Sequence, residues 1–313
     1  MGHRMSVARS ALRVLDPLVG RPLILWARVR SRGVVLLYHR VSAEPAPDYP
    51  PLDPSVFREH LELLGGVFDV LPLSEFVDRL SSGRSLRGCC ALTFDDGYDD
   101  FITDALPILT DRGLPVTHFL VADSVLTGRP PWNARLSRLL RLDPAGRNDR
   151  ASRLIARFSG MRWADRDAAL REWEQRIGDV GDRPPKMISR SSVGELVAAG
   201  VEIGSHTLSH CFLTQASAAE AERELAGSRK VLEDLTGTAI RFASYPQGLY
   251  DSSVEDMARR AGYRAAFAVR QRSAGRGTDL FAIPRFDVTD RPAWMLRMEL
   301  SGVIPWLRSL RAP

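Results

Sequence analysis

At 313 residues the chain can bury one substantial hydrophobic core, and its 44% hydrophobic and 26% charged residues are ordinary for a soluble globular protein. No stretch approaches the ~20 apolar residues of a membrane-spanning helix, which excludes a polytopic membrane protein. The net charge of +5 is uneven: residues 1–40 hold eight Arg and one Asp, giving +7, whereas the rest holds 35 basic and 37 acidic residues, giving −2. Because the main domain is nearly neutral, we expect no nucleic-acid partner.

Residues 1–32 form a basic, partly apolar N-terminal segment. The segment can lie on an anionic membrane surface as a peripheral contact, or pack as a helix on the main domain. Asp16, Pro17, Arg21 and Pro22 interrupt its apolar run, so there is no clear cleavable signal peptide. We therefore expect the protein in the cytoplasm or peripherally attached to the cytoplasmic membrane.

Apolar runs and helical stretches alternate along the rest of the chain. In chain order, the patterns predict strands at 33–38, 89–94, 116–121, 201–204, 264–269 and 280–284, and helices at 56–64, 74–80, 101–112, 192–199 and 218–235. This alternation predicts an α/β fold with a parallel sheet, open or closed into a barrel. About 129–185 the pattern is helical and Arg-rich and is bounded by Pro and Gly, so we interpret it as an insertion within one catalytic domain at 33–313.

Two predicted strands end in residues of catalytic type. Asp95 and Asp96 follow the strand at 89–94, and His206 follows the strand at 201–204. Ligands and catalytic groups collect at the carboxyl ends of strands in parallel α/β folds. We therefore expect these side chains to share one site.

His206 and His210 are spaced i, i+4, which on a helical turn places both imidazoles on one face. With one carboxylate they form a ligand set that leaves a coordination position open, as in catalytic zinc sites. If Asp96 binds the metal, Asp95 is free to act as the general base. The alternative is that the acidic residues around Gly97 form a solvated turn.

The run Thr93 to Gly97 (TFDDG) and the later run Ser205 to His210 (SHTLSH) resemble the first two motifs of the polysaccharide deacetylases, carbohydrate esterase family four. The resemblance extends over about 33–311. It implies that Asp95 is the base, that Asp96, His206 and His210 bind the metal, and that the fold is a distorted (β/α) barrel with fewer than eight regular strands.

The chain departs from the family pattern in two places. The Arg that orients the base in many members is replaced by Ser244, and Arg285, which follows another apolar run, is our candidate substitute. No His follows His210, so the usual late general acid is missing. Tyr38 and His39 resemble the branch in which that motif lies near the N-terminus, which makes His39 the proposed proton donor.

A predicted turn at Tyr245, Pro246 and Gln247 supplies the remaining role. A backbone N–H in this turn, that of Gln247, can stabilise the oxyanion of the reaction, although a turn without a catalytic part has comparable weight. Trp132, Trp163 and Trp173 fall in the insertion and either stack on sugar rings or pack against the domain.

These residues predict a metal-dependent hydrolase that removes N-acetyl groups from amino sugars of a polysaccharide or glycan precursor. Zinc is the expected ion, with manganese, cobalt, nickel or iron as alternatives for the same donors. Two other functions stay open: a deacylase of a different amide or ester, and an inactive homologue that binds glycan. The cysteines Cys89, Cys90 and Cys211 are expected to be buried thiols.

Overall fold

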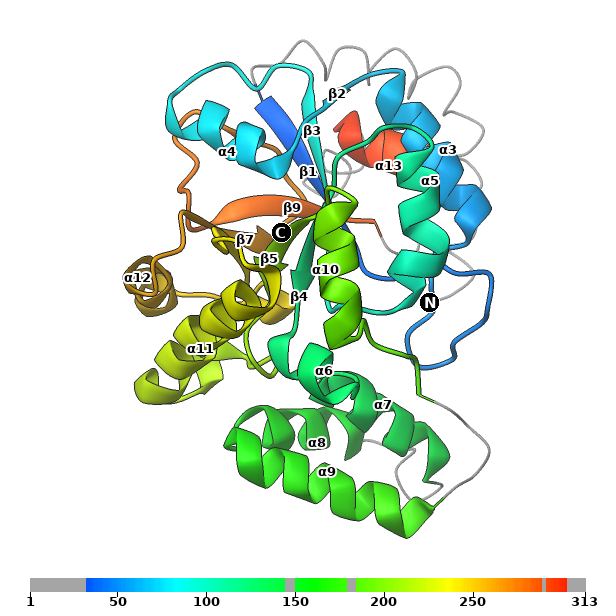
Figure 1. Cartoon of the computed structure of the whole chain (residues 1–313), viewed down its shortest axis with the longest axis vertical. Coiled ribbons are helices and arrows are strands. Elements are labelled where there is room, and N and C mark those ends of the chain that lie inside the picture. The colour runs from blue at the N-terminus through cyan, green and yellow to red at the C-terminus, as the bar shows by residue number, and fades with distance from the viewer. Residues whose placement is uncertain (1–31, 144–149, 179–183, 289–290, 303–313) are drawn as a thin grey trace, which may run out of the picture.

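The computed structural model describes residues 32–143, 150–178, 184–288 and 291–302 (Figure 1). Seven parallel strands close into a barrel, because β1 pairs with β9 on one side and with β3 on the other. In barrel order the strands are β1 (Arg32–Tyr38), β3 (Cys89–Phe94), β4 (Thr117–Leu120), β5 (Glu202–Ser205), β6 (Phe242–Ser244), β7 (Ala265–Val269) and β9 (Ile283–Asp287). The predicted α/β barrel is confirmed.

Two short strands lie outside the closed ring. β2 (Asp69–Val70) pairs parallel to β3, and β8 (Ala274–Gly275) pairs antiparallel to β1. Neither is a barrel strand, and neither was predicted, since a run of two residues carries no periodicity.

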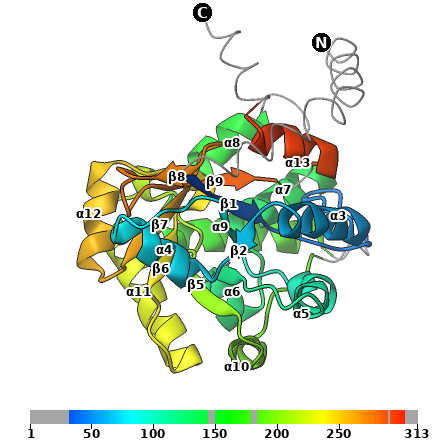
Figure 2. The ribbon, with the colours of Figure 1, turned by 90° about the horizontal axis from the view of Figure 1, so that it is seen from above.

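Helices surround the barrel, as the view from above shows (Figure 2). They are α3 (Pro54–Gly65), α4 (Leu73–Ser81), α5 (Leu106–Thr110), α6 (Ala122–Thr127), α10 (Arg190–Ala198), α11 (Ala218–Thr236), α12 (Ser252–Arg260) and α13 (Ala293–Leu300). The segment expected as one helix over 101–112 begins instead with a π-helical turn, Phe101–Ala105, before α5. No helix among the described residues is long and apolar enough to cross a membrane.

The long helix α11 shows how the sequence sets element boundaries. The Ser217 side chain caps its N-terminus by accepting a hydrogen bond from the Glu220 amide. Gly237 ends it in the left-handed conformation, with φ of 66°. Leu225 and Leu232, both fully buried, face the barrel from this helix.

Side chains alternate between two packed layers along each strand. In β3, Cys90 and Leu92 belong to the large cluster between strands and outer helices. Ala91 belongs instead to a second cluster with Phe119 of β4 and Ile283 of β9, which fills the barrel interior. Residues just beyond a strand end that lie an even number of positions from an inward-facing residue therefore also point toward the barrel axis.

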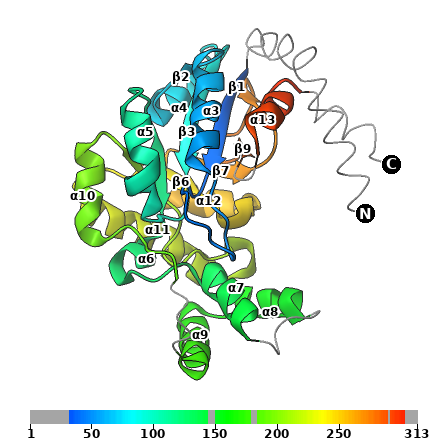
Figure 3. The ribbon, with the colours of Figure 1, turned by 90° about the vertical axis from the view of Figure 1, so that its right-hand side faces the viewer.

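Three helices form the predicted insertion: α7 (Trp132–Leu142), α8 (Arg150–Ser159) and α9 (Trp163–Ile177). Figures 1 and 3 show them as a helical layer beyond one end of the barrel. Arg135 joins two of these helices, since it donates to Asp167 at 2.6 Å and to Glu174 at 2.8 Å. The N-terminal segment, apart from Arg32, lies outside the described residues, so its membrane contact stays a prediction.

Candidate metal centre and active site

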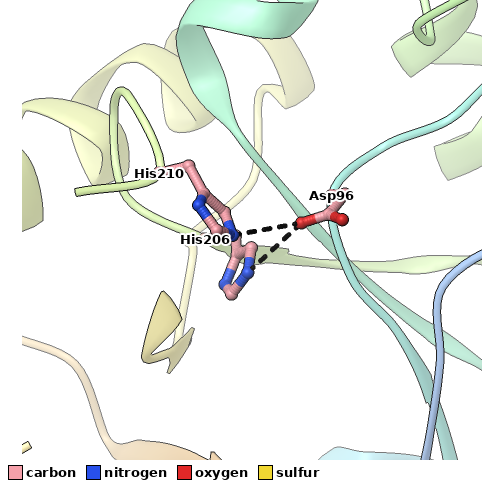
Figure 4. Close-up of side chains that lie close together, drawn as sticks. All are labelled: Asp96, His206 and His210. Atoms are coloured by element: carbon pink, nitrogen blue, oxygen red, sulfur yellow. Dashed lines mark ion pairs between the residues drawn. The ribbon is translucent and has the colours of Figure 1, made fainter. Parts of the chain in front are cut away.

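Asp96, His206 and His210 converge at the carboxyl ends of β3 and β5 (Figure 4). Asp96 Oδ1 lies 3.5 Å from His206 Nε2 and 3.4 Å from His210 Nε2. All three side chains are buried, and one ligand atom of each lies within 4.8 Å of the others. Two donors that bind one ion at about 2.0–2.2 Å in a tetrahedral arrangement lie about 3.4 Å apart, close to the two distances from Asp96 Oδ1.

The buried polar atoms of this cluster fit a cation. Among the described residues, Asp96 Oδ1 has no hydrogen-bond partner although it is fully shielded from solvent. A buried acceptor without a donor is unfavourable, and a cation between the three side chains would satisfy it. The residues present therefore fit a divalent metal.

The pKa of His210 and the orientation of His206 also suit metal binding. Burial lowers the pKa of His210 well below its usual value, and the neighbouring His206 adds to this effect. A neutral imidazole is the form that binds a metal. His206 donates its Nδ1–H to the Ser244 carbonyl oxygen at 2.9 Å, because a carbonyl only accepts, and its Nε2 is therefore the ring nitrogen that faces Asp96.

The expectation that the two histidines share a helical turn is wrong. The segment from His206 to His210 is a non-helical loop, in which Thr207 (φ 66°) and His210 (φ 59°) are left-handed. The Cys211 amide donates to Thr207 Oγ1 at 3.1 Å and closes the loop. The imidazoles meet because the chain turns back on itself, and the i, i+4 spacing gave the right outcome for the wrong reason.

Backbone strain is concentrated around this centre. In the described part of the chain, the non-glycine residues with positive φ are Asp96 (76°), Thr207, His210 and Gln247 (58°). Two are candidate metal ligands, one lies between the histidines, and one lies in the predicted oxyanion turn. Such conformations persist only where surrounding contacts impose them, and they cluster at functional sites.

Asp95 points into the barrel, as expected for a residue four positions after the inward-facing Ala91, and Arg285 of β9 holds it with two hydrogen bonds. Arg285 Nη1 donates to Asp95 Oδ1 at 2.8 Å, and Nη2 donates to Oδ2 at 2.7 Å. The same guanidinium donates to Ser244 Oγ at 2.6 Å and to Thr93 Oγ1 at 3.2 Å. Asp95 Oδ2 lies 3.7 Å from His206 Nε2, so the carboxylate stands beside the metal cluster.

The pKa values of the adjacent Asp95 and Asp96 are shifted in opposite directions. Burial alone would raise the pKa of Asp95, but the Arg285 guanidinium, the nearby His206 and the Arg285 hydrogen bonds outweigh it and hold this pKa well below its usual range. Burial raises the pKa of Asp96, against the opposing charges of His39 and His206. Within the described ranges no Arg pairs with Asp96, which is consistent with a side chain that faces a metal.

Comparison with known proteins identifies the family. The family model of polysaccharide deacetylases matches residues 83–266, more than half of the chain. The chain belongs to the polysaccharide deacetylase family. Members of this family are generally metal-dependent, and the Asp96, His206 and His210 cluster is one that can hold a metal.

Relatives of these deacetylases share sequence or fold with the chain at low identity. The Bacillus subtilis protein YxkH, whose name assigns it to the polysaccharide deacetylases, is 20% identical over 257 residues, which is 82% of this chain and 71% of that protein. The Streptococcus pyogenes deacetylase PplD in complex with acetate is 17% identical with a TM-score of 0.61, covering 85% of this chain and 97% of its own. IcaB from Ammonifex degensii is 21% identical with a TM-score of 0.60, covering 86% of this chain and 97% of its own.

His39, the residue predicted to donate a proton in this deacetylase, follows β1 directly and is half-buried. Because β1 runs parallel to β3, with Tyr38 opposite Phe94, His39 lies at the same end of the barrel as Asp95 and Asp96. Its ring lies edge-on to Tyr49 with centroids 5.4 Å apart.

The loop that carries Tyr49 was not predicted as part of the site. Arg40 holds it, since the guanidinium donates to the Tyr49 carbonyl oxygen at 3.1 Å and to Asp100 at 2.7 Å. Burial raises the pKa of Tyr49 well above its usual value, and the nearby Asp96 adds to this effect. No pattern in the Pro-rich run around Tyr49 signals this position; only the fold brings it to His39.

The predicted oxyanion turn follows β6, and the Tyr245 side chain points away from the three candidate metal ligands into the outer core. Tyr245 is buried in the outer core and donates its hydroxyl to the Phe281 carbonyl oxygen at 3.0 Å. Its amide donates to Phe267, and the Gly248 amide donates to Tyr245. Pro246 has no N–H, so the Gln247 amide stays the donor we predict.

The remaining sequence expectations divide among core and surface. Trp132 is buried, which rules out sugar stacking there, whereas Trp163 is 37% exposed. Trp173 is half-buried and donates its indole N–H to Asp143 at 3.1 Å. The three cysteines are free and buried, as expected.

Proposed function

We propose that this deacetylase is a metal-dependent hydrolase that removes N-acetyl groups from amino sugars of a polysaccharide or glycan precursor. The observation that carries the proposal is the pairing of a three-donor cluster with an Arg-held carboxylate, Asp95, only 3.7 Å from one of its histidines. Metal-assisted hydrolysis of an amide uses a metal site and a general base next to each other.

Asp96, His206 and His210 would hold the metal, and zinc is the ion we favour for two imidazoles and one carboxylate. Manganese, cobalt, nickel and iron accept similar donors. When bound, a divalent ion acidifies water and polarises the amide carbonyl, which makes water a usable nucleophile near neutral pH.

The chain's own residues supply the proton transfers. Asp95 accepts the proton of the attacking water, and Arg285 fixes both carboxylate oxygens so that their direction does not change. The Gln247 amide stabilises the negative charge on the amide oxygen. His39 protonates the departing sugar nitrogen, which converts a poor leaving group into a free amine.

A cavity beside the site supports a neutral glycan as substrate. It has a volume of about 970 Å³ and lies between the loop at 42–49, the turn at 99–104 and the helical insertion. Its lining includes Tyr49, the neighbour of His39, together with six basic and six acidic side chains. A balanced lining favours uncharged N-acetylated sugars over a polyanion.

Acetate release tests the proposal directly. Wild-type protein is assayed on N-acetylglucosamine oligomers and on acetylated xylan, with bound metal measured in the same preparation. We expect acetate from the N-acetylated oligomers, about one metal ion per chain in wild type, and no turnover in Asp95→Asn or His206→Ala. Acetate release from xylan alone would show that the proposed substrate is wrong. Glycan binding without turnover, whichever metal is added, would identify an inactive binding protein.

A further inference from the structure

The loop that carries His210 is held from outside the barrel by helices of the insertion. The Trp132 indole N–H of α7 donates to the His210 carbonyl oxygen at 2.9 Å, across 78 positions of sequence. This bond fixes the peptide group between His210 and Cys211. His210 itself has a left-handed backbone, with φ of 59°. The direction of a side chain depends on its backbone, so this bond bears on where the imidazole points.

The residue before His210 is held as firmly. Both the Ser209 amide and the Ser209 hydroxyl donate to the Glu224 carboxylate of α11, at 2.9 and 2.7 Å. Arg166 of α9 donates to the same hydroxyl at 3.0 Å. Its guanidinium also stacks over the Trp132 ring, 4.9 Å from the ring centre, so the two contacts from the insertion form one unit.

These contacts are buried and polar, which sets them apart from ordinary packing. Trp132 is 4% exposed, Arg166 2% and Glu224 1%. Burying an arginine and a glutamate is costly unless hydrogen bonds satisfy them, and here both bond Ser209. The arrangement fixed here is a strained loop whose last residue is a candidate metal ligand, and left-handed non-glycine residues persist only under such constraint.

We propose that Trp132 and Arg166 are positioning residues for His210, so that the helical insertion sets the metal affinity of the centre. The inference rests on the proposed metal role of His210. Partners that orient a ligand typically change metal affinity by about 10- to 100-fold when removed. The effect appears in metal binding itself, without substrate.

The chain offers a matched control for Trp132. Trp173, also in the insertion, donates its indole N–H to Asp143, and no hydrogen bond joins it to the histidine loop in the described structure. Metal-free wild type, Trp132→Phe and Trp173→Phe are titrated with Zn²⁺ against a competing chelator, and the melting temperature of each metal-free protein is measured. We expect about 10-fold weaker binding in Trp132→Phe and a change of less than about twofold in Trp173→Phe.

Equal metal affinity in the two tryptophan variants would overturn the inference, even if Trp132→Phe lowers the melting temperature. If Trp132→Phe fails to fold, Arg166→Met, which removes the other contact of the insertion with the histidine loop, is compared with Trp173→Phe. Weaker binding only in Arg166→Met supports the inference, and equal binding refutes it. A wild type that binds no Zn²⁺, indistinguishable from His206→Ala, would refute the proposed function and this inference with it.

Discussion

Replacing Arg285 with methionine removes the group that holds the proposed base. Arg285 is fully buried and makes two charged hydrogen bonds to Asp95, at 2.8 and 2.7 Å. Methionine fills much of the same space without donors. Removing one partner of a buried ion pair costs about 3–5 kcal/mol, mostly because the other charge is left unpaired. We therefore expect the free energy of unfolding of Arg285→Met at neutral pH to be lower than that of wild type by about this amount.

The pH dependence follows from the direction of the Asp95 pKa. In wild type this pKa is held below its unfolded value, so the pair contributes stability above that unfolded value and loses it only in strong acid. In Arg285→Met, burial is opposed less and the pKa of Asp95 rises. The stability difference between the two proteins should be largest at neutral pH, and it should shrink as the pH falls below the raised pKa of Asp95 in the variant, where the buried carboxyl takes up a proton.

Turnover gives the catalytic side of the same prediction. A base displaced by about 1 Å loses roughly 10²-fold in rate, so kcat should fall by at least that factor in Arg285→Met. Arg285→Lys keeps the charge but loses the two-pronged geometry, and it should also be impaired. Bound metal should stay near wild type, because Arg285 contacts Asp95 and not Asp96. Unchanged kcat in Arg285→Met would refute the reasoning.

Three further predictions follow from the site and its surroundings. Chelation should lower the free energy of unfolding by about 2.7 kcal/mol relative to protein at 100 times its metal Kd, and have no effect in His206→Ala. His39→Gln should reduce kcat by about 10²- to 10⁴-fold with bound metal unchanged, and a smaller loss would remove His39 as proton donor. His118→Phe should stabilise the fold by about 1–3 kcal/mol, since both ring nitrogens of the buried His118 lack partners among the described residues. Burial lowers the pKa of His118 to about 3, so this gain should grow as the pH falls from about 7 toward 4 in chemical denaturation.

The sequence was most informative where strand periodicity continued into a polar residue. Ala91 and Asp95 share a parity in β3, and Ile283 and Arg285 share one in β9. Two inward-facing charged residues at the carboxyl ends of barrel strands must meet or be left unpaired. The sequence pointed to Arg285 only because it follows an apolar run, and the structure explains the outcome through this shared inward parity, while the role of Arg285 in turnover remains a prediction.

Loop geometry and long-range polar contacts could not be predicted in the same way. Nothing in the spacing of His206 and His210 encodes left-handed φ values at Thr207 and His210. Trp132 and His210 are 78 residues apart, and their bond depends on how the insertion folds back over the barrel. Tryptophan at helical spacing predicts burial, but it does not indicate which carbonyl will receive the indole N–H.

The positions of strain link stability to metal binding in this deacetylase. Asp96, His210 and Gln247 each hold a left-handed backbone that glycine would adopt without penalty. Glycine would relieve about 1–3 kcal/mol at each position, but at Asp96 and His210 it would delete a candidate ligand. A folded domain has a net stability of only about 5–15 kcal/mol, so strain of this size must be offset near its source. The contacts of Trp132 and Ser209 offset part of it without metal, and a bound cation would offset more, because it pairs with the Asp96 oxygen that otherwise lacks a partner. The ligands are therefore expected to be least well held in the metal-free protein, which makes the strained loop the first part to respond when the metal is removed.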